Sequence, residues 1–293
     1  MESKTAANKF ERREAWRALL IFMFLVIIYD VVFDGIMIIY GHSSSDLIMG
    51  VMWGPGLAAI CTCLILKRKI SSLPWNWGAW KWNRQAYLLP IVYGMAIYLP
   101  VWLLGLGGSS FGNEVTMQKW SANVVGEANY STWSVLFNVL MLASFGVIAA
   151  ASRALGEEIG WRGFMIWEMR KLMPFWAVGL FSGLIWAMWH WPAILFTDYN
   201  AGEGNFYLQM FLFTASVVPV GIVLAYYSFK SKSLWPAVIL HASHNLFIQK
   251  IYTPITVKGV ESHLYIDEFG IMMPIVTWIL AIYFLYKAQK ESL

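Results

Sequence analysis

Long apolar runs separated by short polar segments occupy most of this chain. A membrane-spanning helix needs roughly 20 mainly apolar residues. Runs of about that length lie at 16–38, 47–66, 86–106, 134–156 or somewhat later, 174–196, 208–229, 233–250 and 270–286. The pattern predicts an all-α, polytopic integral membrane protein built as a bundle of about eight transmembrane helices.

The segments between these runs are short. The tryptophan-rich stretch 74–82 is typical of a membrane interface, 107–132 reads as a polar loop, and 197–207 and 252–268 are shorter loops. The first apolar run is too long for the core of a signal peptide, which predicts a retained first helix. No internal repeat or linker is visible, so we expect residues 1–293 to form a single membrane domain.

Lysine and arginine residues give the predicted topology. With the first segment inside, the outer segments hold only Lys119, Lys250 and Lys258 of the 21 basic residues. Inner segments of membrane proteins carry such an excess of positive charge. The asymmetry predicts eight crossings with both termini cytoplasmic. The long basic inner segments also favour entry of a substrate from the inner face.

Composition narrows the class further. Hydrophobic residues make up 59% of the chain and charged residues 13%, against roughly 25% charged in soluble domains. The net charge of +4 is small and spread along the chain, so we expect membrane lipids and no nucleic acid as partners. Cys61 and Cys63 have neither a second pair nor a nearby histidine, and we interpret them as buried thiols.

Three polar clusters interrupt the apolar helices. A charged side chain within a bilayer costs several kcal/mol, so such residues are functional candidates. The clusters are Gly156-Glu157-Glu158-Ile159-Gly160-Trp161-Arg162, Trp186-Ala187-Met188-Trp189-His190 and His241-Ala242-Ser243-His244-Asn245.

Helical spacing suggests how each cluster is arranged. Residues four apart share a helix face, so Glu158 can pair with Arg162, and His241 lies beside Asn245. Glu157 is turned about 100° from Glu158 and points elsewhere. Trp186 precedes His190 by one turn, so its indole can form a wall beside the imidazole. The clusters predict one polar pocket.

The clusters can meet only if the fourth helix is long. If the uncharged run ended near Ser152, Glu157 would lie just outside the membrane, far from His190. Setting the inner boundary at Arg170-Lys171 places Glu157 about 20 Å deep. We therefore expect a long or broken fourth helix, with the break near Gly156 and Gly160.

Taken together, these motifs resemble the CPBP family, which includes CAAX prenyl endopeptidases of the Ras-converting type and bacterial Abi-type bacteriocin-immunity proteins. Glu-Glu-x-x-x-Arg, an aromatic-x-x-x-His and His-x-x-x-Asn follow one another on successive helices, and the resemblance covers about 145–250. Trp186 departs from the usual Phe. The resemblance implies an intramembrane endopeptidase that cleaves a membrane-associated, CAAX-type substrate, with a catalytic core at 145–250.

The resemblance also implies roles for the matching residues. Glu157 would be the general base, and His190 would help it to hold and polarise the attacking water. His241 and Asn245 would stabilise the oxyanion of the tetrahedral intermediate. The supporting residues would be Glu158, Arg162 and Trp186. We expect a multi-pass protein of a prokaryotic plasma membrane.

Several alternatives stand beside this interpretation. Glu157, His190 and His241 could instead bind zinc, with water as the fourth ligand, although the resemblance favours a site without a cofactor. A non-catalytic immunity or regulatory scaffold could share the fold. A transporter would favour two symmetric halves, which are not visible. We interpret His244 as structural, and Asp30 and Asp34 as interfacial or packing residues; each could also be functional.

Overall fold

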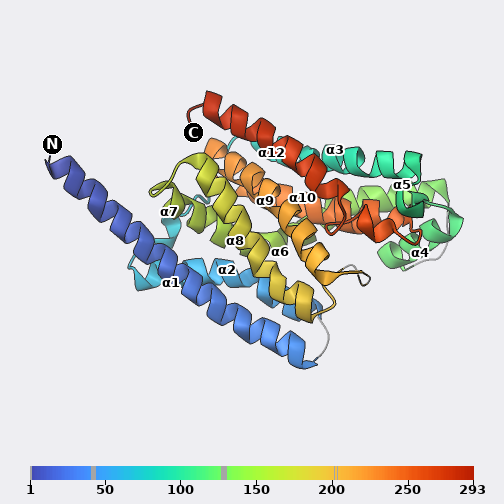
Figure 1. The fold of residues 1–293 in the computed structure, drawn as a ribbon, viewed down its shortest axis with the longest axis horizontal. Helices are drawn as coiled ribbons and strands as arrows, with labels where there is room; N and C mark the ends of the chain where they lie inside the picture. The colour runs from blue at the N-terminus through green and yellow to red at the C-terminus, as the bar shows by residue number, and fades with distance from the viewer. Residues whose placement is uncertain (1, 41–43, 127–130, 201, 203) are drawn as a thin grey trace.

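The computed structural model describes residues 2–40, 44–126, 131–200, 202 and 204–293. Nearly all of this part of the chain is helical, and the long helices lie alongside one another in a bundle (Figure 1). The described strands are β1 (Ser110–Phe111) and β2 (Thr256–Val257), which pair antiparallel and join two loops. The predicted all-α membrane class is confirmed.

Seven helical segments in the described part of the chain are long and apolar enough to cross a membrane. They are α1 (Glu2–Tyr40), α2 (Ser45–Ile65), α3 (Trp80–Leu104), the run from α5 to α7, α8 (Phe175–Phe196), α9 (Phe206–Ser231) and α12 (Met272–Lys290). The remaining predicted crossing, 233–250, corresponds to α10 (Trp235–His244), the π-helical segment η5 (Asn245–Tyr252) and α11 (Thr253–Ile255). Its change of hydrogen-bond pattern divides it into pieces too short to count as one long helix.

The fourth crossing is long, as predicted. It runs without a gap through α5 (Thr132–Met141), the π-helical segment η3 (Leu142–Gly146), α6 (Val147–Gly160), the π-helical segment η4 (Trp161–Met165) and α7 (Ile166–Arg170). The helix is not broken at Gly156 or Gly160; the π-helical turn follows them. Single π-turns inside α-helices occur often at functional sites.

Gly156 and Gly160 serve close packing against α2. A Cβ atom on Gly156 would lie 2.7 Å from the carbonyl oxygen of Met52, and one on Gly160 would lie 2.5 Å from that of Pro55. On the other side of the bundle, a Cβ on Gly183 in α8 would lie 2.7 Å from the carbonyl oxygen of Val218 in α9. Small residues let these helix backbones approach.

The connecting segments hold more structure than the sequence suggested. The stretch 107–132, predicted as a polar loop, contains the helix α4 (Glu114–Val125), whose first turn is capped by the side chain of Asn113. The other short elements are η1 (Ile70–Ser72), η2 (Leu106–Gly108) and η6 (Ser262–Leu264). Local capping, rather than apolar periodicity, marks the beginning of α4.

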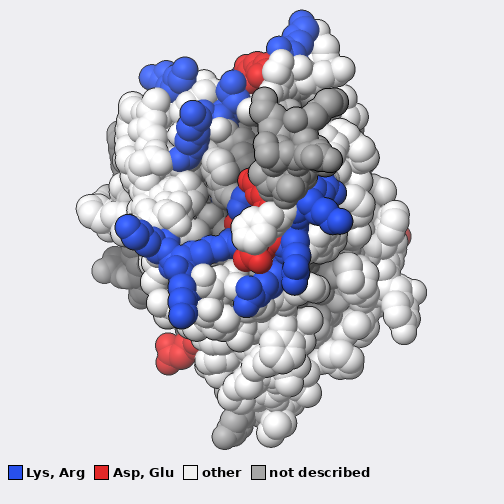
Figure 2. Space-filling model, turned by 90° about the vertical axis from the view of Figure 1, so that its left-hand side faces the viewer, with Lys and Arg blue, Asp and Glu red and all other residues white. Residues whose placement is uncertain are grey.

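The N-terminal part of α1 and the C-terminal part of α12 lie at the same end of the bundle (Figure 1). Figure 2 shows the molecule from this end. Lys and Arg side chains gather there. Two arginines that the charge count had placed in inner segments lie elsewhere. Arg153 and Arg162 are both within the long fourth crossing, and the Arg162 side chain is fully buried.

Candidate active site

Glu157 and Glu158, at the end of α6, point in different directions. Glu157 accepts a hydrogen bond at Oε2 from the indole Nε1 of Trp186 at 2.8 Å, and it lines a cavity between the helices. Glu158 accepts at Oε1 from Arg162 at 3.0 Å and from His241 Nδ1 at 2.8 Å, away from that cavity. As predicted, the two neighbouring side chains point in different directions, so Glu157 and Glu158 have different hydrogen-bond partners.

Arg162 and Trp186 connect the side chains of Glu157 and Glu158. The predicted pair with Glu158 forms, and both side chains are fully buried. The Arg162 guanidinium lies over the Trp186 ring, 4.2 Å from its centroid, a contact that stabilises a desolvated cation. The Trp186 indole therefore does more than form the predicted aromatic wall, because it also donates to the carboxylate of Glu157.

The His190 side chain, on α8, is held by a backbone carbonyl one turn earlier in the same helix and by aromatic rings. Its Nδ1 lies 2.9 Å from the carbonyl oxygen of Trp186. Because a carbonyl oxygen only accepts, Nδ1 carries the proton, and Nε2 of the neutral ring keeps a lone pair. Phe213 and Trp189 pack around the ring with centroids 5.0 and 4.7 Å away. His190 lines the same cavity as Glu157.

His241 and Asn245, one turn apart, approach from α10 and the start of η5. The Nδ1 atom of His241 donates to Glu158, which leaves Nε2 for the cavity that His241 lines. A second proton on the ring would make Nε2 a hydrogen-bond donor toward the cavity. Asn245 is half-buried and also lines the cavity.

The cavity that joins these residues has a volume of about 550 Å³. Its wall contains Glu157, His190, His241 and Asn245 together with mainly apolar side chains. The structure thus brings all four predicted catalytic residues to one cavity. A mostly apolar cavity with a few convergent polar groups is the usual form of a small-molecule or peptide site.

A second polar group lines the same cavity, and the sequence analysis missed its central residue. Glu268, in the loop before α12, accepts hydrogen bonds from His244 Nε2 at 2.9 Å, Gln249 Nε2 at 3.1 Å and the Tyr199 hydroxyl at 3.0 Å. Tyr93 contacts the other ring nitrogen of His244. Burial alone would raise the pKa of Glu268, but these donors lower it to about 2.

The residues that Glu268 contacts lie on both sides of Asn245 along the chain. Glu268 holds His244 and Gln249, which flank Asn245 along the chain, so the loop before α12 fixes the π-helical segment η5. The structural role predicted for His244 agrees with these contacts. Nothing in the local spacing around Glu268 links it to residues 19 to 69 positions away.

Asp30 and Asp34 face inward from α1, which agrees with the predicted packing role and not with an interfacial one. Asp34 is 7% exposed and lines the cavity, and one buried oxygen of each carboxyl group has no hydrogen-bond partner among the described residues. The apolar run around them gave no sign that this face of α1 would meet the cavity.

Metal binding finds no support in the geometry. Among the described residues, no group of three or more His, Cys, Asp or Glu side chains is arranged to hold a metal ion. This includes Glu157, His190 and His241, the set named for zinc.

Comparison with known proteins agrees with the motifs. Residues 132–247 match the family described as type II CAAX prenyl endopeptidase Rce1-like. This region is similar to that family. The chain is also 26% identical over 232 residues to CAAX prenyl protease 2 of Methanococcus maripaludis, covering 75% of this chain and 79% of that protein.

The two matches support the suspected family and an intramembrane endopeptidase activity in a multi-pass membrane protein. The Rce1-like region contains every residue of the predicted site, from Glu157 to Asn245. It ends before Glu268, so the contacts that fix η5 come from a part of the chain outside the matched region.

Proposed function

We propose that Glu157 and His190 activate a water molecule that hydrolyses a peptide bond of a membrane-associated substrate. The observation that carries the proposal is the convergence of Glu157, His190, His241 and Asn245 on one largely apolar cavity. The Rce1-like match supports the reaction class. The roles of Glu157, His190 and His241 rest on their hydrogen bonds, and that of Asn245 rests on its place in the cavity wall.

The water would be held between two acceptors. Trp186 occupies Oε2 of Glu157, which leaves Oε1 for a proton of the water. The Nε2 lone pair of His190 accepts the other proton as a hydrogen bond. As the water oxygen attacks the substrate carbonyl carbon, Glu157 takes the first proton, and it later delivers this proton to the leaving amine.

The developing oxyanion would lie beside His241 and Asn245. The Nε2–H of a protonated His241 and the side-chain amide of Asn245 are two donors one turn apart on the same helical run. Glu158 stabilises the charge of His241 from behind, at 2.8 Å. Fixed donors in a site with little water stabilise a tetrahedral intermediate without reorganising.

The substrate is proposed to be a membrane-associated peptide cleaved near its end. CAAX-type prenylated peptides are the first class to test, because the Rce1-like match and the Methanococcus maripaludis relative both carry that description. The apolar wall of the cavity suits a substrate that partitions into lipid. We propose the plasma membrane of a prokaryote as the location.

A library of membrane-tethered peptides tests the proposal. Purified wild type, Glu157→Ala, His190→Ala and His241→Ala would be incubated with the library, and products identified by mass spectrometry. We expect wild type to release defined fragments and all three variants to lose at least a hundredfold in rate, a loss typical of catalytic groups. Unchanged cleavage by Glu157→Ala would refute the mechanism.

A further inference from the structure

We propose that Asp34, together with Asp30, forms a subsite that binds a basic side chain of the substrate peptide within a few residues of the scissile bond. The proposal rests on the proposed function and names a charge that the substrate carries. The group recognised is an ammonium or a guanidinium ion, because these cations donate several strong hydrogen bonds to a carboxylate.

The two aspartates lie on the face of α1 that packs against the bundle. Val26 and Met37, one turn before and one turn after them, are at most 4% exposed, whereas Val31 is 68% exposed. Residues four apart lie one above the other on a helix. Asp30 and Asp34 therefore form a short acidic row that faces the protein and not the lipid.

The acidic row has hydrogen-bonding capacity that the protein leaves unused. One buried oxygen of each carboxyl group accepts no hydrogen bond from the described residues. No described arginine or lysine forms an ion pair with Asp30 or Asp34. Buried polar groups nearly always have a partner, so each exception calls for an explanation. A donor supplied by the substrate explains both oxygens.

The acidic row borders the catalytic cavity. Asp34 is 7% exposed and lines the cavity together with Glu157 and His190. Asp30 lies near the indole of Trp189 and within electrostatic range of Glu157. The Trp189 ring lines the same cavity and packs on His190, with centroids 4.7 Å apart. One aromatic ring therefore connects the acidic row to the proposed catalytic imidazole.

Other charged groups of the cavity wall have different surroundings. Glu268 accepts three hydrogen bonds, and Glu157 accepts one from an indole. Arg153 and Lys250, which line the cavity from α6 and η5, form no described ion pair with the acidic row. Asp34 is thus a lining acid with a buried oxygen left for a ligand.

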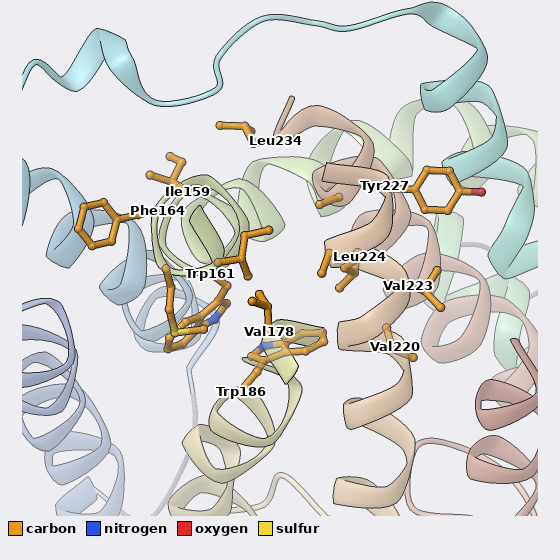
Figure 3. Close-up of a cluster of buried hydrophobic side chains, with 14 of the residues drawn as sticks. Ile159, Trp161, Phe164, Val178, Trp186, Val220, Val223, Leu224, Tyr227 and Leu234 are labelled. Carbon is orange, nitrogen blue, oxygen red and sulfur yellow. The ribbon is translucent and has the colours of Figure 1, made fainter. Parts of the chain in front are cut away.

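The apolar surroundings strengthen the attraction for a cation. Figure 3 shows buried apolar side chains beside Trp186, among them Val178 and Val220, and these offer no hydrogen bond to a charged group. Opposite charges attract more strongly in such surroundings than in water. A cation bound at Asp34 would also relieve the repulsion between the carboxyl groups of Asp30 and Asp34.

The size of the cavity limits how far the basic residue lies from the bond that is cleaved. A volume of about 550 Å³ encloses a drug-sized ligand or a short peptide segment. The basic side chain therefore belongs to a residue close to the scissile bond. Because a site built for a polar partner discriminates against an analogue that lacks it, the acidic row would determine substrate specificity.

A lysine scan tests the proposal. A lipid-anchored CAAX-type peptide would carry one Lys, or Met as a neutral residue of similar length, at each position near the scissile bond. We expect Lys to raise kcat/KM at least about tenfold over Met at one or two adjacent positions. Asp34→Asn should reduce this preference to less than about twofold, and Asp34→Glu should retain most of it.

The matched control is Asp46→Asn, because Asp46 is exposed in the first turn of α2 and does not line the cavity. This variant should keep the full preference. The preference is a ratio measured within each variant, so a general loss of folded enzyme cancels. A preference that wild type lacks, or that survives in Asp34→Asn, would overturn the proposal. An equal gain at every position would also overturn it, since that is the effect of a general field.

Binding separates this proposal from the proposed function. Fluorescence anisotropy of the labelled peptides with Glu157→Gln enzyme gives affinities without turnover. We expect the Lys peptide to bind at least about tenfold more tightly than the Met peptide, and the added Asp34→Asn substitution to remove the difference. If wild type cleaves no peptide, the proposed function fails, and an affinity difference that depends on Asp34 still supports the subsite. Equal affinities, or a difference lost when phosphatidylethanolamine replaces phosphatidylcholine in the micelles, would overturn it.

Discussion

The buried pair of Glu158 and Arg162 yields a quantitative prediction. Glu158→Gln keeps the size of the side chain but removes the charge that faces the guanidinium. Glu158 Oε1 accepts from Arg162 at 3.0 Å, while Nε and Nη2 of Arg162 have no hydrogen-bond partner among the described residues. The substitution therefore leaves a fully buried cation without its carboxylate.

Removing one partner of a buried ion pair costs about 3–5 kcal/mol. The melting temperature falls by about 2–4 °C per kcal/mol in chains of this size class, so we expect a decrease of roughly 6–20 °C. Arg162→Met in the same chain removes the stranded charge. The double variant should recover most of the lost stability, because the apolar side chain fits a buried site beside Trp186.

Thermal unfolding of wild type, Glu158→Gln and the double variant, each purified in detergent, would measure these differences in stability. Glu14→Gln is the matched control, since Glu14 pairs with Arg17 at 3.9 Å on the exposed surface, where a pair contributes about 0–1 kcal/mol. The reasoning is refuted if the double variant is less stable than Glu158→Gln alone, or if the exposed and buried substitutions lower the melting temperature equally.

Three further predictions concern the site. Asn245→Ala should lower kcat about 10²–10³-fold with little change in KM, whereas Asn138→Ala, a buried amide away from the cavity, should leave kcat nearly unchanged. Glu268→Gln should lower kcat by loosening η5. The folded-state pKa of Glu268 is about 2, below the ordinary 4.5, so the wild-type protein should lose stability as the pH falls from 4.5 to 2. The stability of the Glu268→Gln variant should lack this dependence on pH. Exhaustive chelation should leave activity unchanged; a loss restored by zinc would favour the metal alternative.

Apolar periodicity and helical spacing were sufficient for much of the site. The long fourth crossing followed from the need to bring Glu157 and His190 to similar depths. The Glu158–Arg162 pair and the shared face of His241 and Asn245 followed from residues four apart. These features depend on local helix geometry, which the chain specifies within a few turns.

Features made by distant contacts could not be predicted in this way. Glu268 reaches His244, Gln249 and Tyr199 only because the loop before α12 folds back onto η5. The hydrogen bond from Trp186 to Glu157 joins two helices, α8 and α6, whose bonded residues are 29 positions apart in the chain.

The single-turnover cleavage rate of Glu157→Gln measures the central claim most directly. Gln has nearly the same shape and still accepts the indole hydrogen bond of Trp186 at one oxygen, but its amide takes no proton from water. The account predicts that the cleavage rate falls at least a hundredfold while the affinity for the peptide stays within about threefold of wild type. A Glu157→Gln enzyme that cleaves at the wild-type rate would contradict it.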